Sequence, residues 1–217
     1  MAAARDGIDA LLRDRGLRRT TPEITTESLF RGAFASARLS GSTVTLDQLR
    51  AGSIDGPSTS ALRVSTELMS LAPLLSRTPA QAFARLHLLA AGTEEAGRPV
   101  DAERAQRLRS LGEVLTAPLQ APALVVAAVV HAELATVRPF GSLDSVVARA
   151  AERMVLVERG VDPTSLTVPE AAHLRLQAEY ESNLRGYAEG GPDGVRSWLL
   201  YASEAYALAA ELSPLND

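Results

Sequence analysis

The chain has 217 residues, a formal net charge of −4 at pH 7 and 22 basic residues, none of which is lysine. Hydrophobic residues make up 46% of it and aromatic residues 4%, so a core must be built mainly from alanine, leucine and valine, which favours helix over sheet. The absence of cysteine excludes disulfides, thiolate nucleophiles and cysteine-bound zinc. A net negative charge gives no general attraction to nucleic acid or anionic membranes.

The lack of lysine indicates only a GC-rich genome, and we expect a bacterial one. The longest apolar run, 121–130, is too short to span a bilayer, and no leader pattern opens the chain. We therefore expect a cytoplasmic protein with neither a membrane nor a nucleic-acid partner.

Residues 1–20 carry five arginines and three aspartates around the apolar stretch "IDALL". Because the two charges are mixed, a short packed or frayed helix is a better interpretation than a basic arm. We treat this segment as an N-terminal arm or short helix ahead of the main domain, which we expect to cover 21–217.

Helical periodicity dominates the remainder. Pro22 in "TTPE" predicts a helix start after a threonine cap, and Thr45 with Gln48 predicts a capping box. Helices are expected at 21–39, 46–51, 60–76, 79–91, 100–115, 122–136, 143–159, 169–186 and 194–212. Flexible loops are expected at 51–60 and 92–99. With no convincing strand pattern and no internal repeat, the sequence predicts one all-α domain of about eight to ten helices.

Four of these segments differ in how apolar and polar residues are distributed along them. The segment 122–136 is apolar almost throughout and predicts a buried helix. One face of 100–115 carries Val100, Ala105, Leu108, Leu111 and Leu115. The segment 143–159 is amphipathic, and the charged residues that lie mostly off its apolar face are Arg149, Glu152, Arg153 and Arg159. On the last helix Trp198, Tyr201 and Tyr206 share roughly one face, which favours core or interface packing over an aromatic binding platform.

The junction "RPFGSL", 138–143, lies between the apolar and the amphipathic helix. Ser142 is a candidate N-cap, with Asp144 in the first turn. A helix N-terminus can receive a phosphate, but cradling one closely usually takes glycines. Here Leu143 adds bulk and Asp144 adds negative charge. These residues by themselves favour an ordinary capped loop over a phosphate site.

The twelve residues "RPFGSLDSVVAR", 138–149, resemble the motif HPFxxGNGRxxR of the Fic family, which has the Fido fold. Pro139, Phe140 and Arg149 match it. The flanks "AAVVHAELATV" and "AERMVLVERGVDP" are similar to the family's flanks, as is the C-terminal stretch "YESNLRGYAEGGPDGVRSWLLYASEA". This order and spacing implies a single helical Fic-like domain.

An upstream segment, "AFASARLSGSTVTLDQL", resembles the part of some Fic proteins that carries their own inhibitory helix. The resemblance makes 23–41 an inhibitory-helix-like segment. Its motif, (S/T)xxxE(G/N), would correspond to Ser36, Ser40 and Gly41, with Ser40 where glutamate is expected.

The resemblance implies a reaction in which AMP passes from ATP, with Mg²⁺, to a hydroxyl of a target protein. The motif histidine is then the general base, and the acid after Phe holds the metal. The Gly-Asn-Gly loop and first arginine hold the phosphates, and the last arginine binds the γ-phosphate or the inhibitory glutamate.

This chain departs from that set at most positions. Arg138 stands where the base is expected, and arginine, with a pKa above about 12, cannot accept a proton at neutral pH. Gly141 replaces the metal-binding acid, Asp144 and Ser145 fall in the phosphate loop, and Val146 replaces the first arginine. Only Arg149 remains of the charged set. We therefore predict no catalytic residue and no metal ligand, and expect neither ATP nor Mg²⁺ as a cofactor.

Other polar residues have modest roles in this interpretation. His131, two turns before the junction, is expected to be a core histidine bonded to a neighbouring helix rather than a substitute base. Glu133 is expected to pair with a base such as Arg138 or Arg149. His87 and His173 are expected on the surface or in packing. Residues 92–100 fall where Fic proteins carry a target-aligning hairpin, but they are too short and too helix-flanked to predict one.

Two functional hypotheses follow. In the favoured one the chain is a degenerate Fic domain without AMPylation activity, a scaffold or regulatory module that binds an unidentified protein and forms a homodimer. In the alternative, Arg138 and Arg149 hold a phosphate-containing ligand, with their pairing to Asp144, Glu133 or a helix C-terminus as the structural counterpart. Nucleotide binding separates the two. An ordinary helical protein unrelated to the family would require the ordered flanks to match by chance.

Overall fold

The computed structural model describes residues 1–13, 21–118 and 121–217. These residues form α-helices and two short 3₁₀ helices with no strand among them, so the all-α prediction is confirmed. The first half comprises α1 (Ala2–Leu11), α3 (Pro22–Leu39), α4 (Leu46–Arg50), α5 (Gly56–Leu71), η2 (Ala72–Leu74), α6 (Pro79–Ala91) and α7 (Ala102–Thr116). The second half comprises α8 (Ala123–Val137), α9 (Asp144–Glu158), α10 (Pro169–Arg175), α11 (Gln177–Glu189), α12 (Gly191–Glu211) and η3 (Pro214–Asn216).

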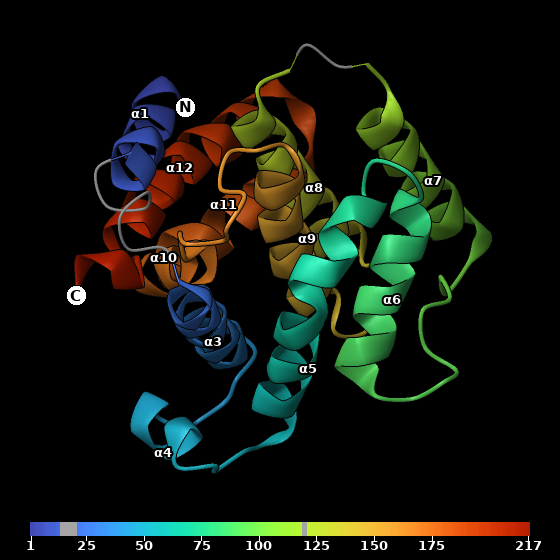
Figure 1. The fold of residues 1–217 in the computed structure, drawn as a ribbon. Helices are drawn as coiled ribbons and strands as arrows, with labels where there is room; N and C mark the ends of the chain where they lie inside the picture. The colour runs from blue at the N-terminus through green and yellow to red at the C-terminus, as the bar shows by residue number, and fades with distance from the viewer. Residues whose placement is uncertain (14–20, 119–120) are drawn as a thin grey trace.

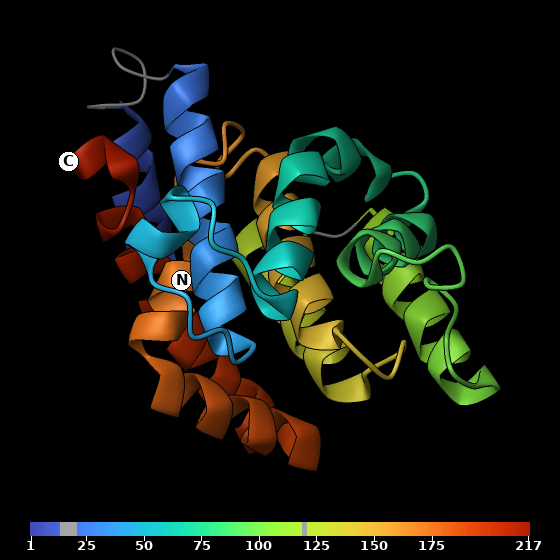
Figure 2. The ribbon, with the colours of Figure 1, turned by 90° about the horizontal axis from the view of Figure 1, so that it is seen from below.

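The pair α8 and α9 forms the centre of the molecule. Helices α1, α10, α11 and α12 lie on one side of it and α5, α6 and α7 on the other (Figure 1). The view from below shows the same division, with α3 between α10 and α5 (Figure 2). A helix that is apolar on every face must be covered on every face, which is why α8 is central. The prediction of a buried helix at 122–136 is therefore confirmed.

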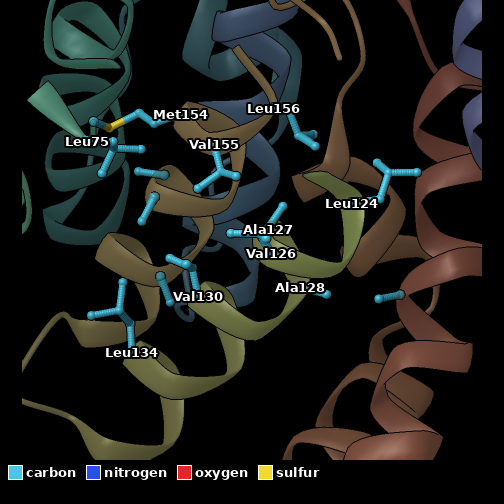
Figure 3. Packing of buried hydrophobic residues seen from close by; sticks show 14 of the residues in the cluster. Leu75, Leu124, Val126, Ala127, Ala128, Val130, Leu134, Met154, Val155 and Leu156 are labelled. Carbon is cyan, nitrogen blue, oxygen red and sulfur yellow. The ribbon is translucent and has the colours of Figure 1, made fainter. Parts of the chain in front are cut away.

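Small side chains bring these two helices together (Figure 3). Ala127, Ala128 and Val130 of α8 are fully buried, as is Met154 of α9. Alanine and valine leave room for neighbouring backbones to approach, and larger residues such as Leu134 and Leu156 fill what remains. The core is thus built largely from the residue types that the composition predicted.

Prolines and capping residues in the sequence predicted the starts of several helices correctly. The helix predicted from "TTPE" spans Pro22–Leu39, and the one predicted at 79–91 spans Pro79–Ala91. Thr45 and Gln48 form the predicted capping box, in which each side chain bonds the other residue's backbone N–H.

Other predictions were wrong in part. The loop expected at 51–60 ends early, because Asp55 and Ser58 form a second capping box that starts α5 at Gly56. The single helix expected at 169–186 is broken at Leu176 into α10 and α11. Val100 is not on the core face of its helix: it precedes α7 and is 52% exposed.

The N-terminal segment is helical where it is described. α1 packs against α12 and buries Ala4 and Ile8, which favours the packed helix over the basic arm for residues 2–11. The remaining arginines of the segment fall mostly in 14–20, outside the described residues. Among the described helices none is long and apolar enough to cross a membrane.

Candidate functional site

The motif loop, 138–143, joins α8 to α9. Arg138 ends α8 in the left-handed conformation (φ 51°) and is exposed, and its Nη2 donates to the carbonyl of Gly141 at 3.2 Å. Within the loop, Pro139 and Phe140 are buried, whereas Gly141 and Ser142 are exposed. The side-chain hydrogen bond described for Arg138 is therefore to the loop itself, and not to Asp144, Glu133 or a helix C-terminus as predicted.

The start of α9 differs from the prediction. Ser142 is not the N-cap; Leu143 occupies that position with φ 56°, a conformation that non-glycine residues rarely adopt. The cause lies in Asp144, whose Oδ1 accepts a hydrogen bond from the backbone N–H of Phe140 at 2.9 Å. The Asp144 side chain is 3% exposed, so the loop closes around one of its own carboxylates.

His87 of α6 packs on the other side of this loop. Its ring stacks on Phe140 with centroids 4.5 Å apart and planes 9° apart, and it is 6% exposed, so the packing role predicted for it is confirmed. Its Nδ1 accepts a hydrogen bond from the N–H of Gly97 at 2.9 Å. Burial lowers the pKa of His87 and raises that of Asp144.

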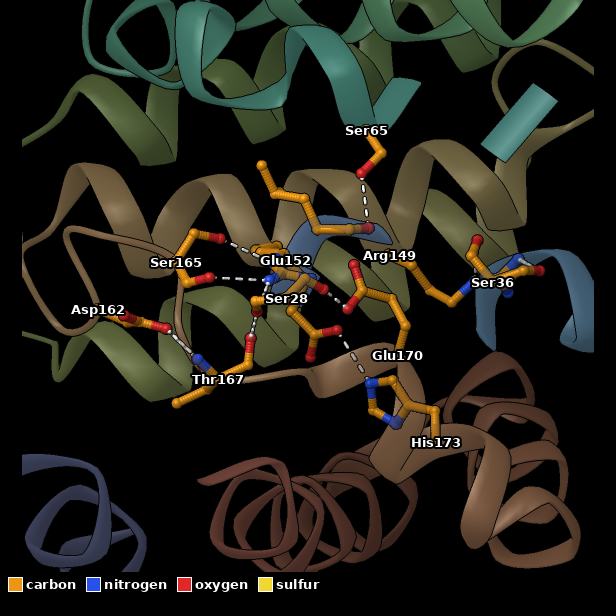
Figure 4. A network of polar contacts seen from close by, with 12 residues as sticks. Ser28, Ser36, Ser65, Arg149, Glu152, Asp162, Ser165, Thr167, Glu170 and His173 are labelled. Atoms are coloured by element: carbon orange, nitrogen blue, oxygen red, sulfur yellow. Dashed lines mark hydrogen bonds and ion pairs between the residues drawn. The ribbon is translucent and has the colours of Figure 1, made fainter. Parts of the chain in front are cut away.

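Arg149 joins the start of α9 to the end of α3 (Figure 4). Its Nε donates to Ser36 Oγ at 2.9 Å, and its Nη2 donates to the Ser36 carbonyl at 3.1 Å and to Ser40 Oγ at 2.7 Å. The residue is 1% exposed. The structure thus brings Arg149 together with two of the three inhibitory-motif positions, while Gly41 follows in an exposed turn with φ 91°. Arg149 also fits the alternative that it binds a helix C-terminus, because Ser36 lies in the last turn of α3.

A second buried arginine, Arg153, was missed by sequence reasoning. It donates to Ser165 through Nε at 2.7 Å, to Glu170 through Nη1 at 3.0 Å and to Ser28 Oγ through Nη2 at 2.5 Å. Gly32 of α3 makes room for it, since a Cβ there would lie 2.3 Å from Nη1. The charged residues placed off the apolar face of α9 therefore include a buried polar group that bonds α3.

Glu152, between the two arginines, was also missed. It is fully buried, and its Oε2 receives His131 Nδ1 at 2.7 Å and His173 Nε2 at 2.9 Å, while Oε1 accepts from the Tyr206 hydroxyl at 2.8 Å. The second ring nitrogens contact the hydroxyls of Tyr180 and Tyr201. We call these six residues the Glu152 hub. The predicted core role of His131 is confirmed, and so is the packing alternative for His173, which is fully buried.

The hub is a chain of hydrogen bonds that ends on one carboxylate. If Tyr180 and Tyr201 each donate to a histidine, and both histidines and Tyr206 donate to Glu152, every side-chain N–H and O–H of the hub has an acceptor. Burial raises the pKa of Glu152, but the two histidines outweigh it and the pKa lies below its ordinary value. Burial also holds the pKa of His131 below its ordinary value.

Two histidines and a carboxylate also invite comparison with a metal centre, because their ligand atoms lie within 4.8 Å of one another. Tetrahedral zinc with bonds of about 2.0–2.1 Å separates its ligand atoms by roughly 3.3 Å. The N–O distances of 2.7 and 2.9 Å are shorter and are those of hydrogen bonds. The arrangement therefore fits hydrogen bonding better than metal binding.

The remaining predicted residues lie apart. Glu133 accepts from Arg107 Nη2 at 2.8 Å and from the Tyr187 hydroxyl at 2.9 Å, so it pairs with a basic residue as expected, but that residue is Arg107 rather than Arg138 or Arg149. Ser145 is exposed on the first turn of α9. Trp198, Tyr201 and Tyr206 are buried, which confirms the packing role predicted for them.

Comparison with known proteins gives a clear answer for the fold. No protein-family model matches the sequence, and no curated protein matches it. Solved structures do match. A Fic-1 fragment from C. elegans superposes with a TM-score of 0.72 at 17% identity, covering 97% of this chain and 71% of that one. A Fic family protein from Desulfovibrio desulfuricans gives 0.73 at 16% identity, covering 96% and 73%.

The chain has the Fic fold. A Fic domain containing signaling protein from Bacteroides thetaiotaomicron matches with a TM-score of 0.66 at 15% identity, covering 95% of each chain. The Fic-like architecture predicted from the order of the flanks is thus confirmed. Identities this low carry the fold alone, so the roles of individual loop residues stay predictions.

The Fic resemblance implies Mg²⁺, and the residues of the motif loop do not fit it. Gly141 has no side chain to offer at the expected position. The nearby carboxylate, Asp144, is buried and already bonds the Phe140 N–H. Mg²⁺ keeps several waters in an octahedral shell, which a carboxylate with 3% exposure cannot accommodate.

Proposed function

We propose that this Fic-fold chain does not transfer nucleotides and acts as a scaffold or regulatory binding module for another protein. The observation that carries the proposal is the bond between Asp144 Oδ1 and the Phe140 N–H. It puts a negative charge where a phosphate would have to approach the loop backbone, and like charges in a buried site repel strongly.

The neighbouring positions support this proposal. Arg138 cannot act as a general base, because it holds its proton at neutral pH. Arg149 is buried beneath α3 and its donors face Ser36 and Ser40, so it is not presented to a ligand.

The proposal is tested by incubating the chain with α-³²P-labelled ATP and Mg²⁺, alone and with candidate acceptor proteins. We expect no labelled protein above the level of a heat-denatured sample, with an active Fic-domain enzyme as positive control. Labelling that requires the native chain and disappears in Arg149→Ala would contradict the proposal.

The alternative function, a sensor for a nucleotide or another phosphate compound, is favoured by one observation. Arg138 is exposed at the first position of the motif loop, where its guanidinium could bind a phosphate without Mg²⁺. In that case pyrophosphate or ADP should bind the chain in the absence of metal, and Arg138→Ala should abolish the binding.

A further inference from the structure

Residues 92–101, between α6 and α7, form a non-helical segment that we call the strap. Two of its backbone N–H groups bond neighbouring elements. Gly97 N–H donates to the His87 ring at Nδ1, and Val100 N–H donates to the Pro139 carbonyl, each at 2.9 Å. The first bond ties the strap to α6 and the second ties it to the motif loop. Among the described residues, the strap is the one segment outside α8, α9 and the loop itself whose backbone N–H bonds a carbonyl of the motif loop.

Close approaches at both attachment points show how closely the strap fits. A Cβ on Gly97 (φ 85°) would lie 2.8 Å from the carbonyl oxygen of Ala84 in α6. A Cβ on Gly141 would lie 2.9 Å from the Val100 side chain. Glycine at 97 thus lets the strap approach the backbone of α6, and glycine at 141 lets Val100 of the strap lie directly against the motif loop.

The bond from Gly97 fixes the protonation state of His87. Since Nδ1 accepts a hydrogen bond, the ring proton must be on Nε2 and the imidazole is neutral. A protonated imidazole carries N–H groups on both nitrogens and has no acceptor. Protonation of His87 must therefore break the bond that ties the strap to α6.

The other ring nitrogen of His87, Nε2, has a potential partner for the protonated state. His87 Nε2 and Asp144 Oδ2 are both buried and, within the described residues, neither has a hydrogen-bond partner. The charge of Asp144, from α9, raises the pKa of His87, and the charge of Arg138, from the loop, lowers the pKa of Asp144. An imidazolium at this position would be attracted to Asp144, whose Oδ2 has no hydrogen-bond partner within the described residues.

We propose that His87 is a pH-operated latch: neutral, it ties the strap to α6 beside the motif loop, and protonated, it releases Gly97, pairs with Asp144 and leaves the strap bonded to the loop only through Val100. Burial lowers the pKa of His87, and Asp144 and the Ser142 backbone oppose this, so the net shift is downward. The strap is accordingly held at neutral pH and released in mild acid. The latch does not depend on whether the chain binds nucleotide.

The test is hydrogen–deuterium exchange of peptides covering 92–101 between pH 7.5 and 5, corrected for the intrinsic pH dependence of exchange. His87→Asn offers an amide oxygen in place of Nδ1 and cannot be protonated. His87→Phe keeps an aromatic ring against Phe140 but accepts no bond. We expect strap exchange in the natural chain to rise roughly fivefold to tenfold as pH falls, as loss of one hydrogen bond implies. In His87→Asn it should stay slow, and in His87→Phe fast, at every pH.

An NMR titration of the His87 ring gives the second measurement. Its midpoint should coincide with the rise in strap exchange, and Asp144→Asn should move both to lower pH, because the imidazolium loses its counter-charge. The proposal is overturned if corrected strap exchange is independent of pH, or if His87→Asn shows the same rise as the natural chain. Should His87→Phe fail to fold, the titration and the His87→Asn comparison still decide.

Discussion

Arg153 and Glu170 form a buried ion pair, 3.0 Å between Nη1 and Oε2, in space that Gly32 leaves open on α3. The pair and the serines around it fasten α3 to α9 at one point, and Arg149 fastens it at another, one turn earlier on α9. Buried charges are costly unless paired and hydrogen-bonded, so the attachment depends on correct geometry at each contact.

Gly32→Ala should lower the free energy of unfolding by about 1–3 kcal/mol, because its Cβ would lie 2.3 Å from Arg153 Nη1 and 2.9 Å from Glu170 Oε2. Gly7→Ala in α1 is the matched control, since nothing lies within 4 Å of its Cβ and alanine is the better helix former. Urea unfolding measures both. Equal or greater stability of Gly32→Ala would show that the ion pair is not held at this distance.

Ser40→Ala should lower stability by about 1 kcal/mol through loss of the Arg149 contact and of the Ser40 bond to the Ser36 carbonyl. Ser145→Ala is the control, because Ser145 is exposed on the first turn of α9 and should change stability by less than about 0.5 kcal/mol. If the two variants are equally stable, Ser40 does not help to hold α3 on α9.

Glu152→Gln should lower stability by roughly 2–4 kcal/mol. The amide puts an NH₂ donor where a carboxylate oxygen accepts, so the hydroxyl or ring N–H groups bonded there must reorient, change tautomer or lose their partner. Glu189→Gln, at the exposed end of α11, is the control. Thermal unfolding followed by circular dichroism would measure both, and a loss below about 0.5 kcal/mol in Glu152→Gln would rule out the hub as a main stabilising element.

Stability should fall as pH drops below about 6.5. The pKa of His131 is lowered in the folded chain, so the unfolded chain takes up its proton first and acid favours unfolding. Glu152, whose pKa is also lowered, adds to the loss below about 4.5, while Asp144, whose pKa is raised, opposes it. One such histidine contributes up to about 1.4 kcal/mol per pH unit. Urea unfolding at several pH values checks this, and a flat profile from pH 7 to 5.5 would contradict it.

The sequence predicted the parts of the fold that depend on local chemistry. The box of Thr45 and Gln48, the proline-started helix at 79–91 and the apolar helix at 122–136 follow from residues a few positions apart. The Asp55 box was present in the sequence as a residue pair three positions apart and was overlooked.

The Glu152 hub could not be predicted in this way. His131, Glu152 and His173 are each 21 residues from the next, and no helical or strand spacing relates them. Periodicity assigned Glu152 and both arginines to a polar face, because it cannot distinguish solvent from a neighbouring helix that offers serines. The break at Leu176 has the same origin: it lets His173 of α10 reach Glu152 while Tyr180 of α11 reaches His131.

The motif loop was predicted by its position and misjudged in its detail. Its place between two helices was inferred correctly, whereas the N-cap was assigned to Ser142. Asp144 turns back to bond the Phe140 N–H, and this contact sets the left-handed backbone at Leu143 that no local preference would suggest.

The most direct test of the proposed function is thermal unfolding of the chain with ATP, ADP, GTP, CDP-choline and pyrophosphate, each with and without Mg²⁺. A ligand present at a hundred times its dissociation constant would add about 2.7 kcal/mol, a shift of several degrees. We predict no shift with any of them. A Mg²⁺-dependent shift with a nucleotide, lost in Arg149→Ala, would contradict the central claim and show that the loop still receives phosphate.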